Sequence, residues 1–224
     1  TSCGPGYLFG SDLGSVSRET NSHCVVYVDN QNSSEFRDTE SWLKTPKKII
    51  SNGPRNVQKK ISNDEGMGIF EGSHDGYVTS HGLTHVRKLK LSQDGQFLEG
   101  EDLMIAIEGS HKRKFDKISK QNDAGQLSIK AAFHVHPSVV IRLDQENNLA
   151  SLALKNGEVW IFNYGLDLHL QLEPTIFFEN GLFEPLESKK LILSGALLDY
   201  STRIKWSLTR ARDKDLSVGD LLKN

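Results

Sequence analysis

Residues 85–107 read HVRKLKLSQDGQFLEGEDLMIAI, and this stretch decides the fold class. Leu89 and Leu91 are two positions apart, so they project from the same face of a β-strand. Residues 93–96 (QDGQ) then interrupt the pattern, and an Asp-Gly pair suits the positive φ values of a type I′ turn. Apolar residues return from Phe97 to Ile107. The stretch therefore predicts two antiparallel strands joined by a tight turn.

The same texture continues along the chain. Residues 155–158 (KNGE) separate two apolar runs and predict a second hairpin. Leucines alternate with polar residues over 166–172, as in an antiparallel strand with one buried face. Further strands are predicted at 24–28, 126–137, 139–143, 149–154, 159–162, 175–178, 190–193 and 203–208. Many short strands and few helix signals predict an all-β fold, a large antiparallel β-sandwich of two packed sheets.

We expect one domain over residues 1–209. Its first part, residues 1–70, is polar and rich in turn residues, so we expect long loops there and no helix. Residues 71–209 are expected to carry the main sheets, with a loop at the charged segment 110–121. Residues 210–224 form a charged tail that is either frayed or ends in a short helix over 217–222.

Composition argues against two classes of partner. The 224 residues hold 27 basic and 29 acidic side chains, which gives a net charge of -2. Nothing in this balance implies nucleic acid or a membrane surface. Local basic runs occur at Lys44-Lys47-Lys48, Lys59-Lys60 and Lys112-Arg113-Lys114. Such runs are usually solvated loops, and the alternative is a rim that contacts a polyanion.

The cysteines and the chain start leave the compartment open. Cys3 and Cys24 do not make a disulfide framework, although a single bridge between them stays possible. No apolar run approaches the ~20 residues of a membrane-spanning helix. No charged segment followed by an apolar one opens the chain, so no signal peptide is predicted. The start at Thr1 lacks Met, and we expect a fragment of a longer protein.

The segment Ser73-His74-Asp75-Gly76-Tyr77 concentrates residue types that can do chemistry. His, Asp and Tyr suit acid–base work or the binding of sugar hydroxyls. Asp75-Gly76 is equally a turn, with His74 and Tyr77 fixing the start of a strand. His81 and His85 follow closely, so a histidine-rich rim of a cleft is the functional alternative.

Three further histidines are candidate ligands. His134 and His136 are two positions apart on a predicted strand, which places two imidazoles on one face and makes half of a metal site. Structural or surface roles are the stronger interpretation of this pair. His23 directly precedes the strand 24–28 and is unremarkable by itself. Phosphate-binding loops, a Gly-x-Ser-x-Gly elbow, a His-Glu-x-x-His helix and a Cys-x-x-Cys pair are absent, so no complete active site is predicted.

Three stretches of the chain nevertheless resemble the heparinase II/III family of polysaccharide lyases, in its bacterial heparinase-like branch. The motifs are Ser2-Cys3-Gly4 with Arg18-x-Thr20-x-x-His23, Asp29 and Ser33-Ser34-Glu35-Phe36; Ser73–Tyr77 with Gly82-Leu83-x-His85-x-Arg87 and Leu98-Glu99-Gly100-Glu101-Asp102; and Phe133–Pro137 with Val159-Trp160-x-Phe162 and Trp206-x-Leu208. The resemblance covers residues 1–209 and implies the C-terminal β-sandwich of such a lyase.

The resemblance also implies an activity for the parent protein. Members of the family cleave uronate-containing, acidic polysaccharides by β-elimination, in a cleft between an N-terminal α/α toroid and the sandwich. The toroid supplies a Tyr and an Asn/His pair, so this chain alone is expected to be inactive. The implied cleft residues are His74, Tyr77, His85 and Arg87.

A metal is the one cofactor that the resemblance implies. His23 matches the family's sandwich histidine of a His and Asp metal site, which would hold a divalent ion, Zn²⁺ or Ca²⁺, in the full-length parent. The family's Asp ligand falls near Ser2-Cys3, where no Asp stands. The partners implied by the resemblance are the acidic polysaccharide and the toroid. A second copy of the chain, in a homodimer, is a further candidate through an apolar patch left bare without the toroid, and composition argues against nucleic acid and a membrane. The location would be bacterial, periplasmic or cytoplasmic.

Two other functions compete with the lyase reading. A non-catalytic carbohydrate-binding sandwich could stack sugar rings on Trp160, Tyr164 and Trp206, provided that these rings form an exposed row. Trp160 and Trp206 stand in apolar strands, which favours core positions instead. The chain could also be a purely structural or assembly module, with an apolar patch at its interface.

Overall fold

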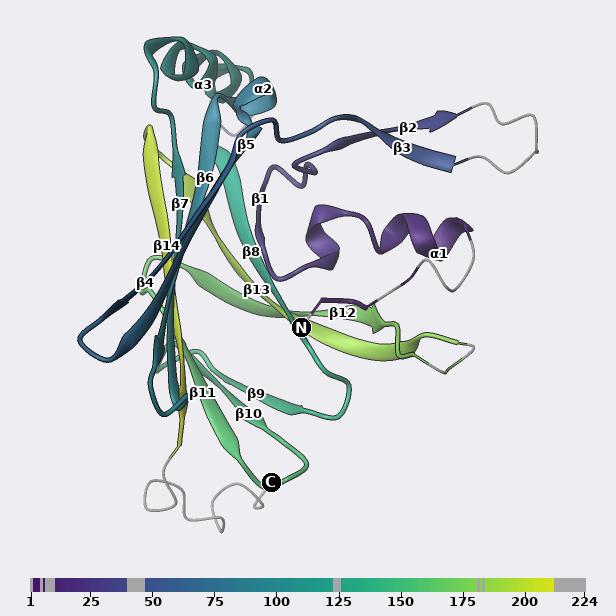
Figure 1. The fold of residues 1–224 in the computed structure, drawn as a ribbon, viewed down its shortest axis with the longest axis vertical. Helices are drawn as coiled ribbons and strands as arrows, with labels where there is room; N and C mark the ends of the chain where they lie inside the picture. Colours follow the sequence, from purple (N-terminus) through teal and green to yellow (C-terminus); the bar gives the residue numbers. More distant parts are fainter. Residues whose placement is uncertain are drawn as a thin grey trace.

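Two antiparallel sheets pack face to face in the computed structural model, which describes residues 2–4, 6, 11–39, 47–122, 126–180, 182 and 184–211 (Figure 1). In spatial order, the larger sheet contains β4 (Val57–Asp64), β5 (Met67–Tyr77), β6 (Leu83–Ser92), β7 (Phe97–Ile105), β14 (Ser201–Arg210), β11 (Val159–Tyr164), β10 (Leu149–Ala153) and β9 (Val140–Asp144). The smaller sheet contains β1 (Val26–Val28), β8 (Leu127–Val135), β13 (Leu186–Leu197) and β12 (His169–Phe177). The predicted all-β sandwich is confirmed.

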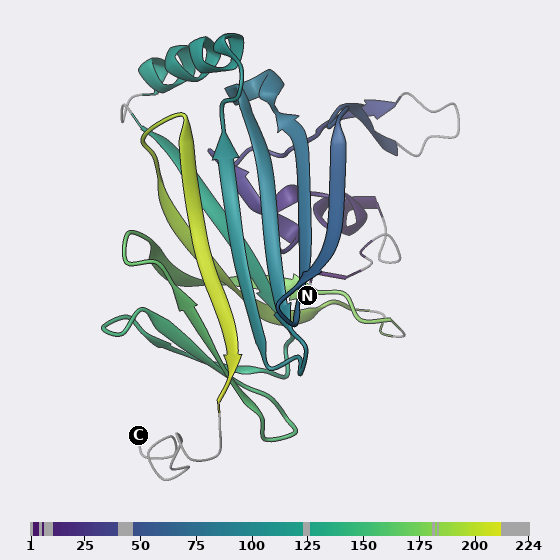
Figure 2. The ribbon, with the colours of Figure 1, turned by 60° about the vertical axis from the view of Figure 1, so that its left-hand side comes forward.

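The other elements lie at the margins of the sandwich. A separate hairpin of β2 (Glu35–Thr39) and β3 (Lys47–Asn52) projects beside α1 (Ser11–Val16) and the 3₁₀ turn η2 (Thr20–Ser22). The helices α2 (Val78–His81) and α3 (Gly109–Gln121) cover one end of the larger sheet, as Figure 2 shows. Among the described helices, none is long and apolar enough to cross a membrane.

An aromatic trio joins the two sheets at the centre of the core. Phe133 of β8 meets Trp206 of β14 and Phe162 of β11 edge-on, with ring centroids 4.9 and 5.0 Å away. Phe162 and Trp206 stack at 6.2 Å. All three rings are buried, and Trp160 and Tyr164 are partly buried. The three candidate sugar-stacking rings therefore do not form an exposed row.

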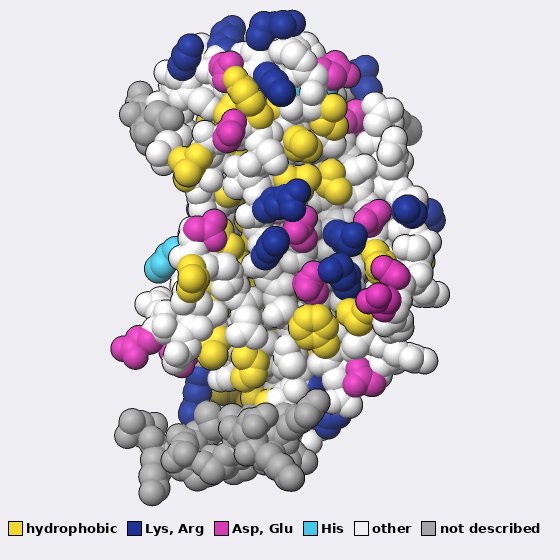
Figure 3. Space-filling view, turned by 90° about the vertical axis from the view of Figure 1, so that its left-hand side faces the viewer, with side chains coloured by type: hydrophobic (Ala, Val, Ile, Leu, Met, Phe, Trp, Pro, Cys, Tyr) yellow, Lys and Arg dark blue, Asp and Glu magenta, His cyan; other side chains and the backbone are white. Residues whose placement is uncertain are grey.

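The outer face of the larger sheet carries matched charges. Facing side chains across β5, β6, β7 and β14 alternate in sign, because the register places Glu71 opposite Lys88, Lys88 opposite Glu101, and Glu101 opposite Lys205. The closest pair is Lys88 to Glu71 at 2.9 Å, and Lys90 to Glu99 is 3.0 Å. Figure 3 shows basic and acidic side chains interspersed on this face. The face therefore offers mixed charge rather than one basic patch for a polyanion.

Several local predictions are wrong. Segment 110–121 lies in α3 rather than in a loop, because Phe115 and Ile118 are one helical turn apart and pack inward among charged neighbours. Phe115 is buried and contacts the Tyr200 ring at 5.8 Å. The region predicted as helix-free loops contains α1, and its turn-rich part contains β2, β3 and β4. Of the tail predicted at 210–224, Arg210 instead ends β14, and residues 212–224, with the predicted helix, lie outside the described residues, as does Lys44.

Two strand details differ from expectation. The strand predicted from Leu166 begins at His169, and Leu166 is exposed. Both predicted hairpins are present, β6–β7 and β10–β11. In the first turn only Gly95 has a positive φ, so the turn is not type I′. Side chains hold it instead, because Asp94 accepts hydrogen bonds from the Ser92 hydroxyl at 2.6 Å and from the Gln96 amide at 3.0 Å.

A test of the core concerns Gly100, which lies directly opposite Trp206. A Cβ at Gly100 would be 2.1 Å from an atom of the indole ring, and the ring is held between Phe133 and Phe162. We expect Gly100→Ala to lower the free energy of unfolding by about 1–3 kcal/mol in urea denaturation. The control is Gly109→Ala, where the nearest atom is 3.5 Å away and the change should stay within about 0.5 kcal/mol. Equal stability of the two variants would contradict the packing argument.

Candidate functional site

A fully buried carboxylate, that of Asp102 in β7, organises the polar interior. It accepts four hydrogen bonds from side chains. His85 Nε2 is 2.8 Å from Oδ1, Arg87 Nε is 2.7 Å from Oδ1, Arg87 Nη2 is 3.0 Å from Oδ2, and Trp206 Nε1 is 3.2 Å from Oδ2. Burial acts to raise the pKa of Asp102, but the His85 bond and the charge and bonds of Arg87 together lower it to about 2. Asp102 is therefore charged in the folded protein.

Two histidines continue the network toward the surface. The Gly76 amide donates to His74 Nδ1 at 3.2 Å, so this nitrogen must be the acceptor. His74 Nε2 therefore carries the hydrogen and donates to His85 Nδ1 at 3.1 Å, and His85 Nε2 donates to Asp102. Burial, with the charges of His85 and Arg87, outweighs the opposing effect of Asp75 and lowers the pKa of His74 to about 4. A second proton on His74 would have to bind Nδ1, where it would face the Gly76 N–H group and find no acceptor.

The strand register explains why these residues meet. In the β6–β7 hairpin Arg87 lies directly opposite Asp102, and across β5 and β6 His74 lies opposite His85. His85 and Arg87 are two residues apart, so both face the interior with Asp102. The three predicted cleft residues His74, His85 and Arg87 are thus neighbours, and Asp102 joins them.

Residues 73–77, at the end of β5, make several contacts with neighbouring segments. Asp75 accepts hydrogen bonds from the amides of Arg55 and Asn56, at 2.8 and 3.1 Å. Gly76 lies so close to the loop before β2 that an added Cβ would be 2.8 Å from the Ser33 carbonyl. Tyr77 is fully buried, and its hydroxyl lies 3.4 Å from the Val26 carbonyl. These contacts are structural, and a role of His74, Tyr77, His85 and Arg87 toward substrate stays a prediction.

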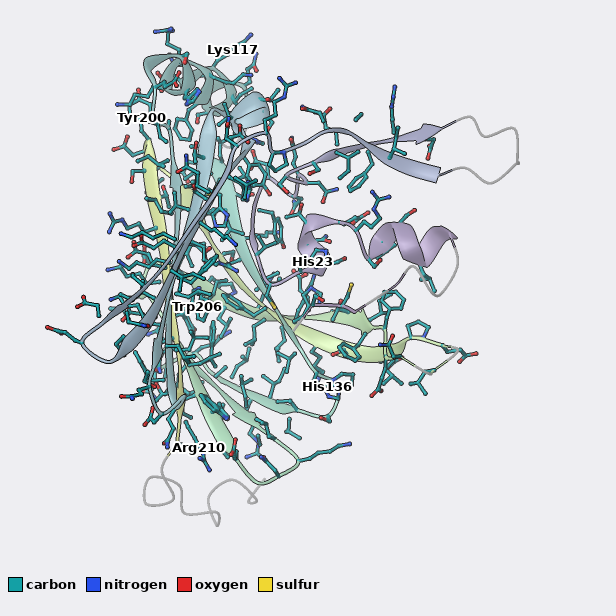
Figure 4. All side chains as sticks on the ribbon, in the orientation of Figure 1. His23, Lys117, His136, Tyr200, Trp206 and Arg210 are labelled. Carbon is teal, nitrogen blue, oxygen red and sulfur yellow. The ribbon has the colours of Figure 1, made fainter. Side chains whose placement is uncertain are left out.

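His23 lies apart from this cluster, on the exposed side of the loop between η2 and β1 (Figure 4). It lines a cavity of about 480 Å³ together with Gly4, Ser17, Arg18, Thr20, Val25, Ser33, Ser34, Phe36 and Ile50. A second cavity of about 430 Å³ shares Arg18, Ser34 and Phe36 with it. The Arg18 guanidinium lies over the Phe36 ring, 4.7 Å from its centroid. The surface around His23 is therefore concave, rich in hydroxyls and cationic at Arg18.

A hydrogen bond from Arg87 connects the buried network to the loop that carries His23. The third nitrogen of Arg87, Nη1, donates to the carbonyl oxygen of Cys24, at 2.5 Å. On the other side of His23, His134 Nε2 lies 2.9 Å from the carbonyl oxygen of Asn21 and must be its donor. The Cys24 thiol accepts a hydrogen bond from the His134 amide at 3.2 Å, and neither Cys24 nor Cys3 forms a disulfide. The sequence left the pairing of Cys3 and Cys24 open, and in the structure they are not bridged.

The two histidines of the predicted His134–His136 metal pair have separate hydrogen-bond partners. His134 is directed to the Asn21 carbonyl, whereas His136 bonds the Ser138 hydroxyl at 2.8 Å and contacts the Phe177 ring at 5.0 Å. His136 lines a separate groove of about 1000 Å³ between the ends of β8, β9, β12 and β13. Within the described residues, no three His, Cys, Asp or Glu side chains come together as a metal site.

Sequence reasoning missed Asp102 as the centre of the network and Asn21 as an anchor of the loop. A signal for Asp102 was present. Once the 93–96 turn sets the register, Leu91 pairs with Leu98 and the same count pairs Arg87 with Asp102. Nothing local marks Asn21, because its partner His134 is 113 residues away.

The sequence and the fold were compared with those of known proteins. The sequence model of the family described as "Heparinase II/III-like, C-terminal" matches residues 1–207. A search of curated proteins found no match. Among solved structures, heparan sulfate lyase HepC from Pedobacter heparinus superposes with a TM-score of 0.63 at 11% identity, over 88% of this chain and 25% of that one.

Two further structures give the same result. The heparinase III that is the BT4657 gene product has a TM-score of 0.63 at 10% identity, over 91% of this chain and 26% of its own. A structure named heparinase III has a TM-score of 0.61 at 12% identity, over 90% and 25%. At this identity the likeness concerns the fold alone. This chain spans about a quarter of the length of each.

A stability test of the buried carboxylate uses Asp102→Asn. The amide keeps the shape but leaves the partly buried Arg87 charge without its counter-ion, so we expect a loss of about 2–4 kcal/mol in unfolding free energy. The control is Glu101→Gln on the same strand, whose partners Arg203 and Lys205 are exposed, with an expected change below about 1 kcal/mol. Similar denaturation midpoints for both variants would show that Asp102 is not central.

A pH test concerns His74. In the unfolded chain its pKa returns to about the ordinary 6.5, whereas in the folded domain it is about 4. The unfolded state therefore binds more protons between these values, and stability should fall as the pH drops from 6.5 toward 4. Burial also lowers the pKa of His81 and His134, so the wild type should lose stability at all three sites. The loss, measured by urea denaturation at pH 7 and pH 5, should be smaller in His74→Gln, and an equal loss would contradict the assignment.

Proposed function

Because the chain belongs to the heparinase II/III-like C-terminal family, we propose that it is the β-sandwich domain of a polysaccharide lyase. The substrate would be an acidic polysaccharide that contains uronate, cleaved by β-elimination. The structures with the same fold are named heparan sulfate lyase and heparinase III, which supports this substrate class. The remaining catalytic groups would come from an N-terminal α/α toroid of the full-length protein.

The observation that carries the proposal is the exposed His23 at the edge of a cavity that also contains Arg18. In β-elimination a base takes the proton from the carbon beside the carboxylate. The electron pair forms a carbon–carbon double bond, and the neighbouring carbon–oxygen bond breaks with protonation of the leaving oxygen. An exposed imidazole can accept or supply a proton near neutral pH. His23 would thus contact the sugar from the sandwich side of the cleft.

Arg18 would bind the negatively charged groups of the substrate. A guanidinium can bind a carboxylate or a sulfate with two parallel hydrogen bonds, and its charge stabilises the anion that forms when the proton leaves. Arg18 lines both cavities, and its guanidinium is in contact with the Phe36 ring. The outer face of the larger sheet lacks this property, because its lysines face glutamates.

A metal at His23 does not fit the described surroundings. The cavity offers one imidazole, several hydroxyls and a guanidinium, and its described lining has no carboxylate or thiol, whereas Zn²⁺ takes about four imidazole, thiolate or carboxylate ligands and Ca²⁺ takes about 6–8 oxygens that include carboxylates. No step is therefore assigned to a metal.

The proposal is tested on the full-length protein that contains this domain, incubated with heparan sulfate, heparin and other uronate polymers. Ultraviolet absorbance of the new double bond reports β-elimination, and we expect product from at least one polymer. His23→Ala should lower kcat by about 100-fold or more, as for a lost acid or base. The control is His169→Ala, an exposed histidine of β12, which should leave kcat unchanged. Absence of unsaturated product from every polymer would overturn the proposal.

A further inference from the structure

His23 is exposed, yet the backbone on both sides of it is held by buried side chains. Two residues before it, the Asn21 carbonyl accepts from His134 Nε2 at 2.9 Å. One residue after it, the Cys24 carbonyl accepts from Arg87 Nη1. Arg87 belongs to the larger sheet and His134 to the smaller one. The His23 peptide is thus fixed from both layers of the sandwich at once.

We propose that Arg87 and His134 are positioning residues that form a two-point clamp on the His23 loop and set where its imidazole stands in the cavity. The clamp is the pair of contacts from Arg87 to the Cys24 carbonyl and from His134 to the Asn21 carbonyl. This inference deepens the proposed function and rests on it for its kinetic consequence.

The Arg87 side of the clamp is rigid because its guanidinium has no freedom left. Two of its nitrogens are committed to the two oxygens of Asp102, at 2.7 and 3.0 Å, which fixes the plane of the group. The N–H groups of the third nitrogen, Nη1, then lie in that fixed plane, and Nη1 donates to the Cys24 carbonyl. Asp102 is in turn held by His85 and Trp206, so the plane is set by the core.

The His134 side adds two contacts to the same loop. Its ring donates to Asn21, and its backbone amide donates to the Cys24 thiol at 3.2 Å. The loop has further supports: the Ser22 carbonyl accepts from the Cys3 amide at 3.0 Å, and the Val25 carbonyl accepts from the Ala132 amide at 3.0 Å. Consecutive peptide groups around His23 are therefore anchored while its side chain alone points outward.

A lysine at position 87 separates positioning from mere charge. Its single nitrogen keeps the pairing with Asp102 but cannot also reach Cys24 in the fixed geometry of the fork. At position 134, glutamine can place an N–H near the position of His Nε2, whereas leucine cannot. Arg87→Lys and His134→Leu should therefore release the loop, and His134→Gln should restore its hold.

The first measurement is NMR of the His23 ring in this 224-residue chain. We expect Arg87→Lys and His134→Leu each to shift and broaden the ring resonances of His23, and His134→Gln to return them toward the wild type. The matched control is Leu197→Ala, a buried change in β13 that lowers stability by about 2–5 kcal/mol without touching the loop. Unmoved His23 resonances in both clamp variants, or equal movement in Leu197→Ala, would overturn the inference.

The second measurement is kinetic, on the full-length protein. Displacement of a reacting group by about 1 Å can cost up to about 100-fold in rate, so Arg87→Lys should lower kcat by about 10- to 100-fold with KM nearly unchanged. Leu197→Ala, assayed well below its unfolding temperature, should keep the wild-type kcat. If the clamp variants move the His23 resonances but the wild-type protein has no lyase activity, the clamp stands and the proposed function fails. If the wild type is active and the clamp variants match its kcat, the clamp fails and the proposed function stands.

Discussion

The rest of the domain depends on the ionised carboxylate of Asp102, which is sealed from water and bonded by four N–H groups. A buried charge of this kind is tolerated only when its lone pairs are satisfied with good geometry. The donors come from β6 and β14, the strands on either side of β7. Satisfying one carboxylate therefore fixes the side chains of three neighbouring strands, and through Arg87 it reaches the loop before β1.

The sequence predicts the architecture better than the interior contacts. The alternation around residues 93–96 and 155–158 predicts two real hairpins, and the many short strands predict the sandwich. Helix α3 could not be predicted, because only Phe115 and Ile118 are apolar among its 13 residues. Its inward face exists because Tyr200, from the far end of the chain, packs there.

The candidate site shows the same division between local and distant information. His74, His85 and Arg87 are singled out by residue type, and hairpin register alone accounts for their meeting with Asp102. What sequence cannot give is the place of His23. Its loop is held by contacts of the Cys24 and Asn21 carbonyls with Arg87 and His134, which are 63 and 113 residues away, and a carbonyl oxygen has the same chemistry in every residue. The residue types therefore do not reveal which backbone carbonyls accept these hydrogen bonds.

The hold of Arg87 on the Cys24 carbonyl has a consequence for where this module can be divided. The segment before β1 satisfies a donor that belongs to the centre of the larger sheet. Trimming the polypeptide after Cys24 would remove the acceptor of this guanidinium N–H, and a hydrogen bond from a charged donor contributes about 1.5–3 kcal/mol. A boundary drawn at the first strand of the sandwich would therefore cut through its interior, and any transplant of the module must carry the leading segment with it.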